Sequence, residues 1–199
     1  LKGIVFSVKE RLMLLLTLLK SYQTHIGRQN IIHCDLKPEN TIINDKHEIK
    51  ILDFGNAVAL ERVKFNPKRQ PGTPFYSAPE LNFPVNGKSY ISEKTDVFSL
   101  GRMFLVMLRP INPELCCMSG NEWRDLLDSP HSLMLPIFKG ISNDDLSENM
   151  KIQLEVLIDA MTQRLPKNRP SIEDAIAALN EIILSYDLSK KNRVYRAPC

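Results

Sequence analysis

The pattern of apolar and polar positions begins with a strongly apolar segment near the amino terminus. Between Val8 and Ile26 apolar side chains recur on nearly every face of a helical period, and the run Leu12–Leu19 reads LMLLLTLL. A helix that is apolar nearly all round lies inside a domain rather than on its surface. The run is also far shorter than the about 20 residues that a membrane span needs. We therefore predict a buried helix and no membrane partner.

Two short β-branched runs follow, TIIN at residues 41–44 and EIKILD at residues 48–53, with a polar tripeptide between them. This pattern predicts a β-hairpin, which is the only sheet structure that we expect. Residues 56–86 show neither a helical nor a strand period and contain several prolines. Long irregular segments inside a compact domain are usually functional, so we expect this one to carry part of a site.

Beyond residue 90 the patterns are helical. Residues 92–108 end in an almost wholly apolar stretch. Residues 150–163 have apolar side chains at the spacing of an amphipathic helix. Residues 171–186 open with Ser171 and Asp174 in the spacing of a capping box. Several helices against one hairpin predict a mainly α fold. We expect one domain over residues 1–187, followed by a basic tail over residues 188–199.

Composition narrows the functional classes. The 43% hydrophobic and 25% charged fractions are those of an ordinary globular domain. The net charge of +3 is spread along the chain, so we predict no nucleic-acid partner. The four cysteines have neither metal-binding spacing nor the density of a disulfide framework. A reducing compartment fits best, and we expect the protein in the cytoplasm.

Candidate chemistry is concentrated in residues 31–43, IIHCDLKPENTII, where Asp35, Lys37 and Asn40 lie within six residues between two apolar runs. Four further motifs follow: DFG at residues 53–55, APE at 78–80, DVFSLG at 96–101 and RLPKNRPS at 164–171. Together they resemble the eukaryotic-type protein kinases. Each motif alone is weak, but five in the family's order are a strong signal that covers nearly the whole chain. The resemblance implies the fold of the kinase carboxyl-terminal lobe, in which the hairpin carries the catalytic loop and DFG.

The resemblance implies the residues of a phosphoryl-transfer site. Such a site must position its reactants and neutralise charge on the transferred phosphoryl oxygens. Asp35 would accept the proton of the substrate hydroxyl, and Lys37 would supply a cation to the phosphate. Asn40 and Asp53 offer the hard oxygen ligands that Mg²⁺ prefers. Ile42 matches the apolar floor under the adenine of ATP. Lys37, two residues after Asp35, is similar to serine/threonine rather than tyrosine kinases.

Other residues match positions that dock the substrate or hold the domain together. Thr73 lies in GTPFYSAPE, which resembles the loop on which a protein substrate docks, at the position that contacts the catalytic aspartate and lysine. Glu80 and Arg169 match an ion pair that ties this loop to the helices. Asp96 matches a residue that braces the catalytic-loop backbone, and His33 matches a structural histidine.

Cys34 departs from the family pattern. Kinases that are switched by phosphorylation usually carry an arginine there, because a guanidinium can pair bidentately with the added phosphate. The sequence between Asp53 and Thr73 also contains no Ser, Thr or Tyr. We therefore expect activity without phosphorylation of that segment. For Cys34 itself, a small buried filler and a reactive thiol are both open interpretations.

A second departure concerns the phosphate-covering half of the ATP site. No glycine-rich loop, strand lysine or helix glutamate precedes the first helix, so the resemblance is to the carboxyl-terminal lobe alone. We expect the amino-terminal lobe elsewhere in a parent chain or in a partner chain, and little activity from this chain by itself.

Two other functional classes remain as alternatives. A non-catalytic kinase-like binding module would keep these motifs as a scaffold, although retention of Asp35, Lys37, Asn40 and Asp53 together favours catalysis. A small-molecule phosphotransferase would share the H-x-D motif and a downstream metal aspartate, but APE and DVFSLG argue against it. The leading interpretation is a serine/threonine protein kinase that uses ATP and Mg²⁺.

Overall fold

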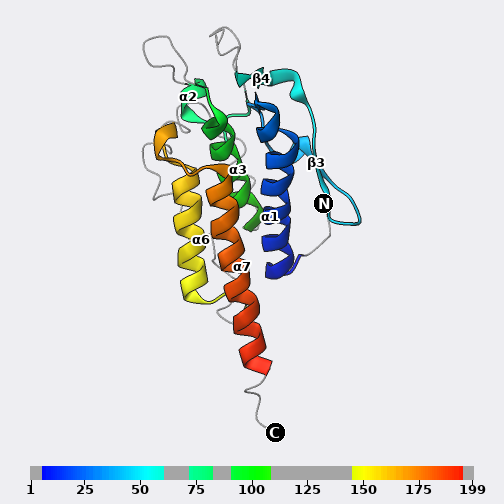
Figure 1. Ribbon diagram of the computed structural model, residues 1–199, viewed down its shortest axis with the longest axis vertical. Coiled ribbons are helices and arrows are strands. Elements are labelled where there is room, and N and C mark those ends of the chain that lie inside the picture. Colours follow the sequence, from blue (N-terminus) through cyan, green and yellow to red (C-terminus); the bar gives the residue numbers. More distant parts are fainter. Residues whose placement is uncertain (1–5, 61–71, 83–90, 109–144, 195–199) are drawn as a thin grey trace.

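The computed structural model describes residues 6–60, 72–82, 91–108 and 145–194, and these are mostly helical (Figure 1). The helices are α1 (Val8–His25), α2 (Pro79–Asn82), α3 (Glu93–Leu108), α6 (Glu148–Met161) and α7 (Ile172–Val194). The strands are β1 (Ile31–Ile32), β2 (Thr41–Ile43), β3 (Ile49–Ile51) and β4 (Val58–Ala59). Short 3₁₀ helices are η1 (Gly27–Gln29), η2 (Pro38–Asn40), η3 (Phe54–Asn56) and η6 (Pro166–Asn168). Much of the segment expected to be irregular, and the end of the expected basic tail, lie outside the described residues.

Helix α1 confirms the buried helix that the sequence predicts. A capping box begins it: the Ser7 hydroxyl accepts from the Glu10 amide, and the Glu10 carboxylate accepts from the Ser7 amide. These bonds satisfy amide groups that have no partner inside the helix. The leucines at its centre are at most 5% exposed; they are Leu12, Leu14, Leu15, Leu16, Leu18 and Leu19. Their burial makes α1 part of the core.

Helices α3 and α7 pack against α1, and α6 packs against both of them. Figure 1 shows α7 between α6 and α1, with its carboxyl-terminal turns extending past both. The capping box of Ser171 and Asp174 is present at the start of α7. Because α7 runs to Val194, the first residues of the expected basic tail are helical.

The sheet structure is larger than the single hairpin that the sequence predicts. Strands β2 and β3 form an antiparallel hairpin in which Thr41 pairs with Ile51 and Ile43 with Ile49. A second antiparallel pair joins β1 to β4, with Ile32 opposite Val58. The predicted hairpin is present, but the expectation that it is the only sheet structure was wrong. Strands of two residues are too short to show a period of two, so pattern analysis misses them.

The two strand pairs bring distant motifs together. Strand β1 leads into residues 33–40, which we call the HCD loop; η2 forms the last three residues of this loop, and β2 follows it directly. Strand β3 leads into DFG, and β4 follows η3 and returns to β1. The HCD loop and DFG are consequently held side by side by backbone pairing at both of their ends.

Candidate active site

The HCD loop is held by Asp96, a fully buried residue in the first turn of α3. Asp96 Oδ2 accepts from the His33 amide at 2.6 Å and from the Tyr22 hydroxyl at 3.1 Å. Asp96 Oδ1 accepts from the Cys34 amide at 2.9 Å. Burial raises the pKa of the Asp96 carboxyl, and the hydrogen bonds from the two amides oppose that rise. One side chain thus fixes two successive peptide groups directly before Asp35.

Cys34 has a backbone conformation that is uncommon for any residue except glycine. Its φ is 64°, in the left-handed region, and Asp96 holds its amide there. The side chain is 1% exposed and packs with Ile32, Leu81 and Ile91. Burial, with the nearby carboxylates, raises the pKa of the thiol, which therefore stays protonated at neutral pH. These properties favour the buried filler over the reactive thiol.

Asp35, Lys37 and Thr73 form a closed network of hydrogen bonds. Asp35 Oδ1 accepts from the Thr73 amide at 3.0 Å and from the Thr73 hydroxyl at 3.1 Å. Lys37 Nζ donates to Asp35 Oδ2 at 3.0 Å and to Thr73 Oγ1 at 2.8 Å. Asp35 is 8% exposed and Lys37 lies close to the surface. The structure therefore brings together three predicted site residues from the HCD loop and the GTPFYSAPE segment.

Gly72 makes this approach possible, and sequence analysis missed its role. Its φ is +96°, and a Cβ there would lie 2.9 Å from the Cys34 carbonyl oxygen and 3.0 Å from Ser77 Oγ. Only glycine adopts this conformation at such close backbone contact without strain. The available signal was a glycine directly before Thr73, but its meaning depends on the distant Cys34 carbonyl.

Asn40 contacts this network directly, and Asp53 follows strand β3, which pairs with the strand directly after Asn40. The buried Asn40 amide donates to the Asp35 carbonyl at 2.9 Å and to Asp35 Oδ2 at 3.4 Å. Within the described part of the chain, Asn40 Oδ1 accepts no hydrogen bond, and the exposed Asp53 carboxylate accepts one, from Gly55. The Leu52 amide donates to the Asn40 carbonyl at 2.8 Å, which ties Asn40 to the residue directly before Asp53. An amide oxygen and a carboxylate with acceptor capacity left are a donor set that fits Mg²⁺ bound with a nucleotide.

Two large apolar side chains that lie close in sequence to Asn40 and Asp53 are exposed. Ile42 on β2 is 53% exposed, and Phe54 is 46% exposed. The ring of Phe54 lies 5.0 Å from that of the fully buried His33, and a His33 ring nitrogen lies 2.9 Å from the Leu52 carbonyl oxygen. His33 therefore connects the HCD loop to Leu52 and to Phe54 of DFG.

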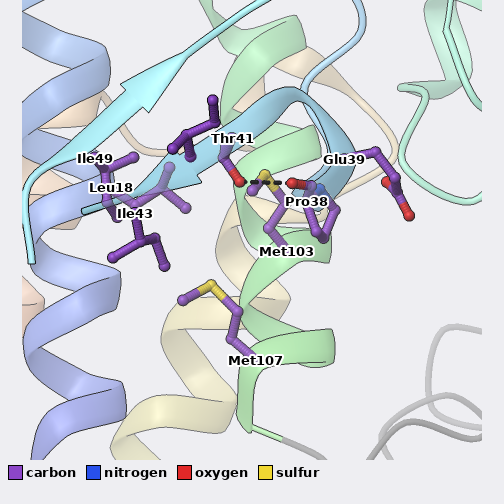
Figure 2. A pocket seen from close by; sticks show the side chains of 9 residues that line it. Leu18, Pro38, Glu39, Thr41, Ile43, Ile49, Met103 and Met107 are labelled. Carbon is purple, nitrogen blue, oxygen red and sulfur yellow. Dashed lines mark hydrogen bonds between the residues drawn. The ribbon is translucent and has the colours of Figure 1, made fainter. Parts of the chain in front are cut away.

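A cavity of about 540 Å³ lies behind the HCD loop (Figure 2). Apolar side chains of α1, α3 and the hairpin line it together with η2: Leu18, Met103, Met107, Ile42, Ile43, Ile49, Pro38, Glu39 and Thr41. The Thr41 hydroxyl at its wall donates to the Pro38 carbonyl at 2.8 Å. Its lining includes none of Asp35, Lys37, Asp53 and Thr73, so the polar network lies outside the cavity.

Glu80 and Arg169 form a buried bidentate ion pair. Arg169 donates to the two Glu80 carboxylate oxygens at 2.7 and 2.8 Å. Its three remaining donors reach the carbonyl oxygens of Lys94, Gln163 and Arg164. All five N–H groups of the guanidinium are thus used. The pair joins α2 to the start of α3 and to the segment before α7, which fixes the base of the GTPFYSAPE segment.

The aromatic ring of Phe98 extends this cluster. The guanidinium carbons of Arg169 and Arg102 lie 4.9 Å and 5.1 Å from its centroid. Arg102 also lies 5.5 Å from the ring of Phe75, in the GTPFYSAPE segment. Cations over aromatic faces are attracted by the ring quadrupole, most strongly where water is excluded. Arg102 therefore links the segment that carries Thr73 to α3, in addition to the Glu80–Arg169 pair.

Comparison with known proteins identifies the class. Residues 4–179 match the family model described as the protein kinase domain, so the chain belongs to that family. This confirms the resemblance to eukaryotic-type protein kinases, and a mostly helical structure accords with it. Members of the family are transferases. None of the described helices is long and apolar enough to cross a membrane.

Individual relatives are serine/threonine and receptor-like kinases. The chain is 33% identical over 147 residues to the serine/threonine-protein kinase SKM1 of Saccharomyces cerevisiae, covering 74% of this chain and 20% of that protein. It is 30% identical over 167 residues to the MDIS1-interacting receptor like kinase 1 of Arabidopsis thaliana, covering 81% and 16%. It is 42% identical over 81 residues to the SNF1-like protein kinase ssp2 of Schizosaccharomyces pombe, covering 41% and 13%. These matches span at most a fifth of each relative.

Proposed function

We propose that this chain is the carboxyl-terminal lobe of a serine/threonine protein kinase, which transfers the γ-phosphate of ATP to hydroxyl groups of protein substrates. The observation that carries the proposal is the closed network of Asp35, Lys37 and Thr73 beside the oxygen groups of Asn40 and Asp53. A base, a cation and ligand oxygens are the groups that phosphoryl transfer requires, so this arrangement supports the proposal.

Asp35 is the general base in this proposal. Its carboxylate takes the proton of the substrate hydroxyl as that oxygen forms a bond to the γ-phosphorus and the bond to ADP breaks. A positioned base contributes about 10²- to 10⁴-fold to such a rate. Lys37, held at 3.0 Å from Asp35, balances negative charge on the transferred oxygens, and Thr73 sets the position of the substrate segment.

Asn40 and Asp53 are the residues that would hold Mg²⁺, and Ile42 would contact the adenine of ATP. When bound, Mg²⁺ neutralises phosphate charge. Asn40 Oδ1, which accepts no hydrogen bond from the described residues, and the exposed Asp53 carboxylate support the metal role, and the 53% exposure of Ile42 supports the adenine contact.

The proposal includes activity without phosphorylation between Asp53 and Thr73. The described network around Thr73 is closed by hydroxyl, amide, carboxylate and ammonium groups of the unmodified chain. Cys34 also has no guanidinium with which to bind a phosphate. Residues 61–71 of that segment lie outside the described residues.

An amino-terminal lobe is the expected partner, in the same parent chain or in another chain. The side chains of Ile42 and Phe54 are 53% and 46% exposed, and exposed apolar side chains support a surface that a second lobe covers. Protein substrates would meet the segment of Thr73. A cytoplasmic location is part of the proposal and rests on the cysteine pattern.

Calorimetric titration of magnesium-ATP into the chain tests the nucleotide site. Asp53→Ala should abolish the binding that the unaltered chain shows, because it removes a charged metal ligand. Asp45→Ala, in the exposed turn of the hairpin, is the matched control and should bind as the unaltered chain does. Equal affinity in both variants contradicts the metal role. No binding by the unaltered chain means that the nucleotide site requires the amino-terminal lobe.

Phosphotransfer to serine and threonine peptides, measured with that lobe present, separates catalysis from a scaffold role. Asp35→Asn should lower kcat by about 10²- to 10⁴-fold and leave nucleotide affinity intact. Unchanged phosphotransfer in this variant contradicts the proposal.

A further inference from the structure

We propose that Tyr22 is a positioning residue for the HCD loop, acting through the Asp96 carboxylate on the peptide groups that precede Asp35. Only the link to catalysis rests on the proposed function. The structural part can be measured without any phosphotransfer.

Three donors from two separate elements converge on Asp96. The Tyr22 hydroxyl, from α1, reaches Oδ2 at 3.1 Å, and the amides of His33 and Cys34 reach the carboxylate at 2.6 and 2.9 Å. Tyr22 is 1% exposed and Asp96 is 0% exposed. No water therefore competes for these oxygens, and the hydroxyl is the donor that connects the carboxylate to the core helix.

The Tyr22 hydroxyl restricts rotation of the Asp96 carboxylate, which the two amides alone do not. The terminal torsion of an aspartate is broad, so a carboxylate bound by one short stretch of backbone can rotate together with that stretch. A third donor on a rigid helix removes this freedom. The left-handed conformation of Cys34 needs such support, because strained backbone persists only where the surroundings over-determine it.

Tyr22 is itself held firmly. The preceding residue, Ser21, donates to the Ile49 carbonyl at 2.7 Å and anchors the same turn of α1 to the hairpin. Burial raises the pKa of Tyr22, as does the negative charge of Asp96, so the hydroxyl remains a donor through the neutral range.

Cys34 provides a local reporter for the test. Its thiol is 1% exposed, and its own amide is one of the groups that Asp96 holds. Alkylation by N-ethylmaleimide in native buffer therefore requires the HCD loop to open. Mass spectrometry of the Cys34 peptide separates its modification from that of Cys116, Cys117 and Cys199.

The experiment compares Tyr22→Phe with Tyr186→Phe in the full 199-residue chain. Tyr186 is also a core tyrosine, 9% exposed, and its hydroxyl makes no hydrogen bond within the described residues. We expect Cys34 alkylation to be about 10- to 100-fold faster in Tyr22→Phe, the factor that corresponds to a hydrogen bond to a charged group. We expect Tyr186→Phe to match the unaltered chain.

Two results would overturn the proposal. One is an unchanged alkylation rate in folded Tyr22→Phe, and the other is an equal acceleration in both variants, which would mean general loosening of the core. If Tyr22→Phe does not fold, all three proteins are compared in trimethylamine N-oxide, which favours folding by exclusion from the surface. Failure of Tyr22→Phe alone to fold even there would assign the hydroxyl to global stability and would likewise reject positioning.

The link to catalysis has its own readout. With the amino-terminal lobe present, Tyr22→Phe should lower kcat by about 10- to 100-fold and leave KM for magnesium-ATP unchanged, because small misplacement of a base is costly. A higher KM with unchanged kcat would contradict the link. If Asp35→Asn keeps full activity while Tyr22→Phe accelerates alkylation, the proposed function fails and the positioning of the loop stands.

Discussion

The buried thiol of Cys34 makes the folding stability of the domain depend on pH. Its thiol is buried and its pKa lies above that of a thiol in the unfolded chain. The unfolded chain therefore releases this proton first as pH rises. Folding stability due to this group is present below the unfolded pKa and is lost above it.

We predict that Cys34→Ala removes this alkaline loss. Between pH 8.5 and 10 the unaltered chain should lose stability faster than the variant, by about 1.4 kcal/mol per pH unit. Urea unfolding followed by circular dichroism at several pH values gives the two slopes. Alanine suits the comparison because it accepts the left-handed conformation at a cost similar to that of cysteine. Parallel slopes would show that the thiol ionises normally in the folded protein.

At the scale of elements, the Glu80–Arg169 pair joins α2, α3 and the segment before α7. Both partners are largely buried, so removal of one leaves the other charged and without its counterion. The Arg169 guanidinium also donates to three backbone carbonyl oxygens, and a side chain with fewer N–H groups could not bind all of them.

We predict that Glu80→Gln destabilises the domain by about 3 to 5 kcal/mol and that Arg169→Lys destabilises it by a similar amount. A lysine keeps the charge but has three donors in place of five. The exposed pair of Lys9 and Asp187 is the matched control, and Lys9→Ala should cost less than about 1 kcal/mol. Unfolding by urea measures all three, and near-normal stability of Arg169→Lys would show that charge alone suffices.

Helical elements could be predicted from the sequence because their apolar periods are long. The segments around α1, α3, α6 and α7 each span several turns, so their patterns stand out from chance. Strands β1 and β4 could not, because two residues have no period. Their pairing depends on where the HCD loop and DFG are held by the rest of the fold.

The site residues also fall into those that the sequence predicts and those that it does not. Residues whose chemistry is carried by a motif, such as Asp35, Lys37 and Thr73, were expected together and lie within hydrogen-bonding distance. Tyr22 and Gly72 were not expected, because each acts on a residue far away in sequence. A tyrosine in an apolar helix and a glycine in a loop are ordinary until the partner is known.

At the scale of the whole molecule, the described contacts around Thr73 need no added phosphate. Tyr76 and Ser77, the nearest other acceptors, are 5% and 2% exposed and are therefore poorly accessible to a modifying enzyme. The Thr73 hydroxyl itself is engaged by Asp35 and Lys37.

We predict that phosphatase treatment leaves the activity of the kinase with both lobes unchanged. Mass spectrometry before and after treatment identifies any phosphate that is removed. A phosphatase-treated kinase that loses activity together with a phosphate on Thr73, Tyr76 or Ser77 would refute independence from phosphorylation. A mock treatment with inactivated phosphatase is the control.

The hydrogen bond from the Cys34 amide to Asp96 spans 62 positions of sequence. A ribosome releases the amino end first, so the HCD loop is synthesised well before the carboxylate that fixes it. Contacts between such distant positions form only after a long segment of chain has been closed into a loop. The loop therefore acquires its geometry late, once α3 has been made and has docked against α1. An incomplete nascent chain that ends before α3 contains the full HCD motif without its conformation.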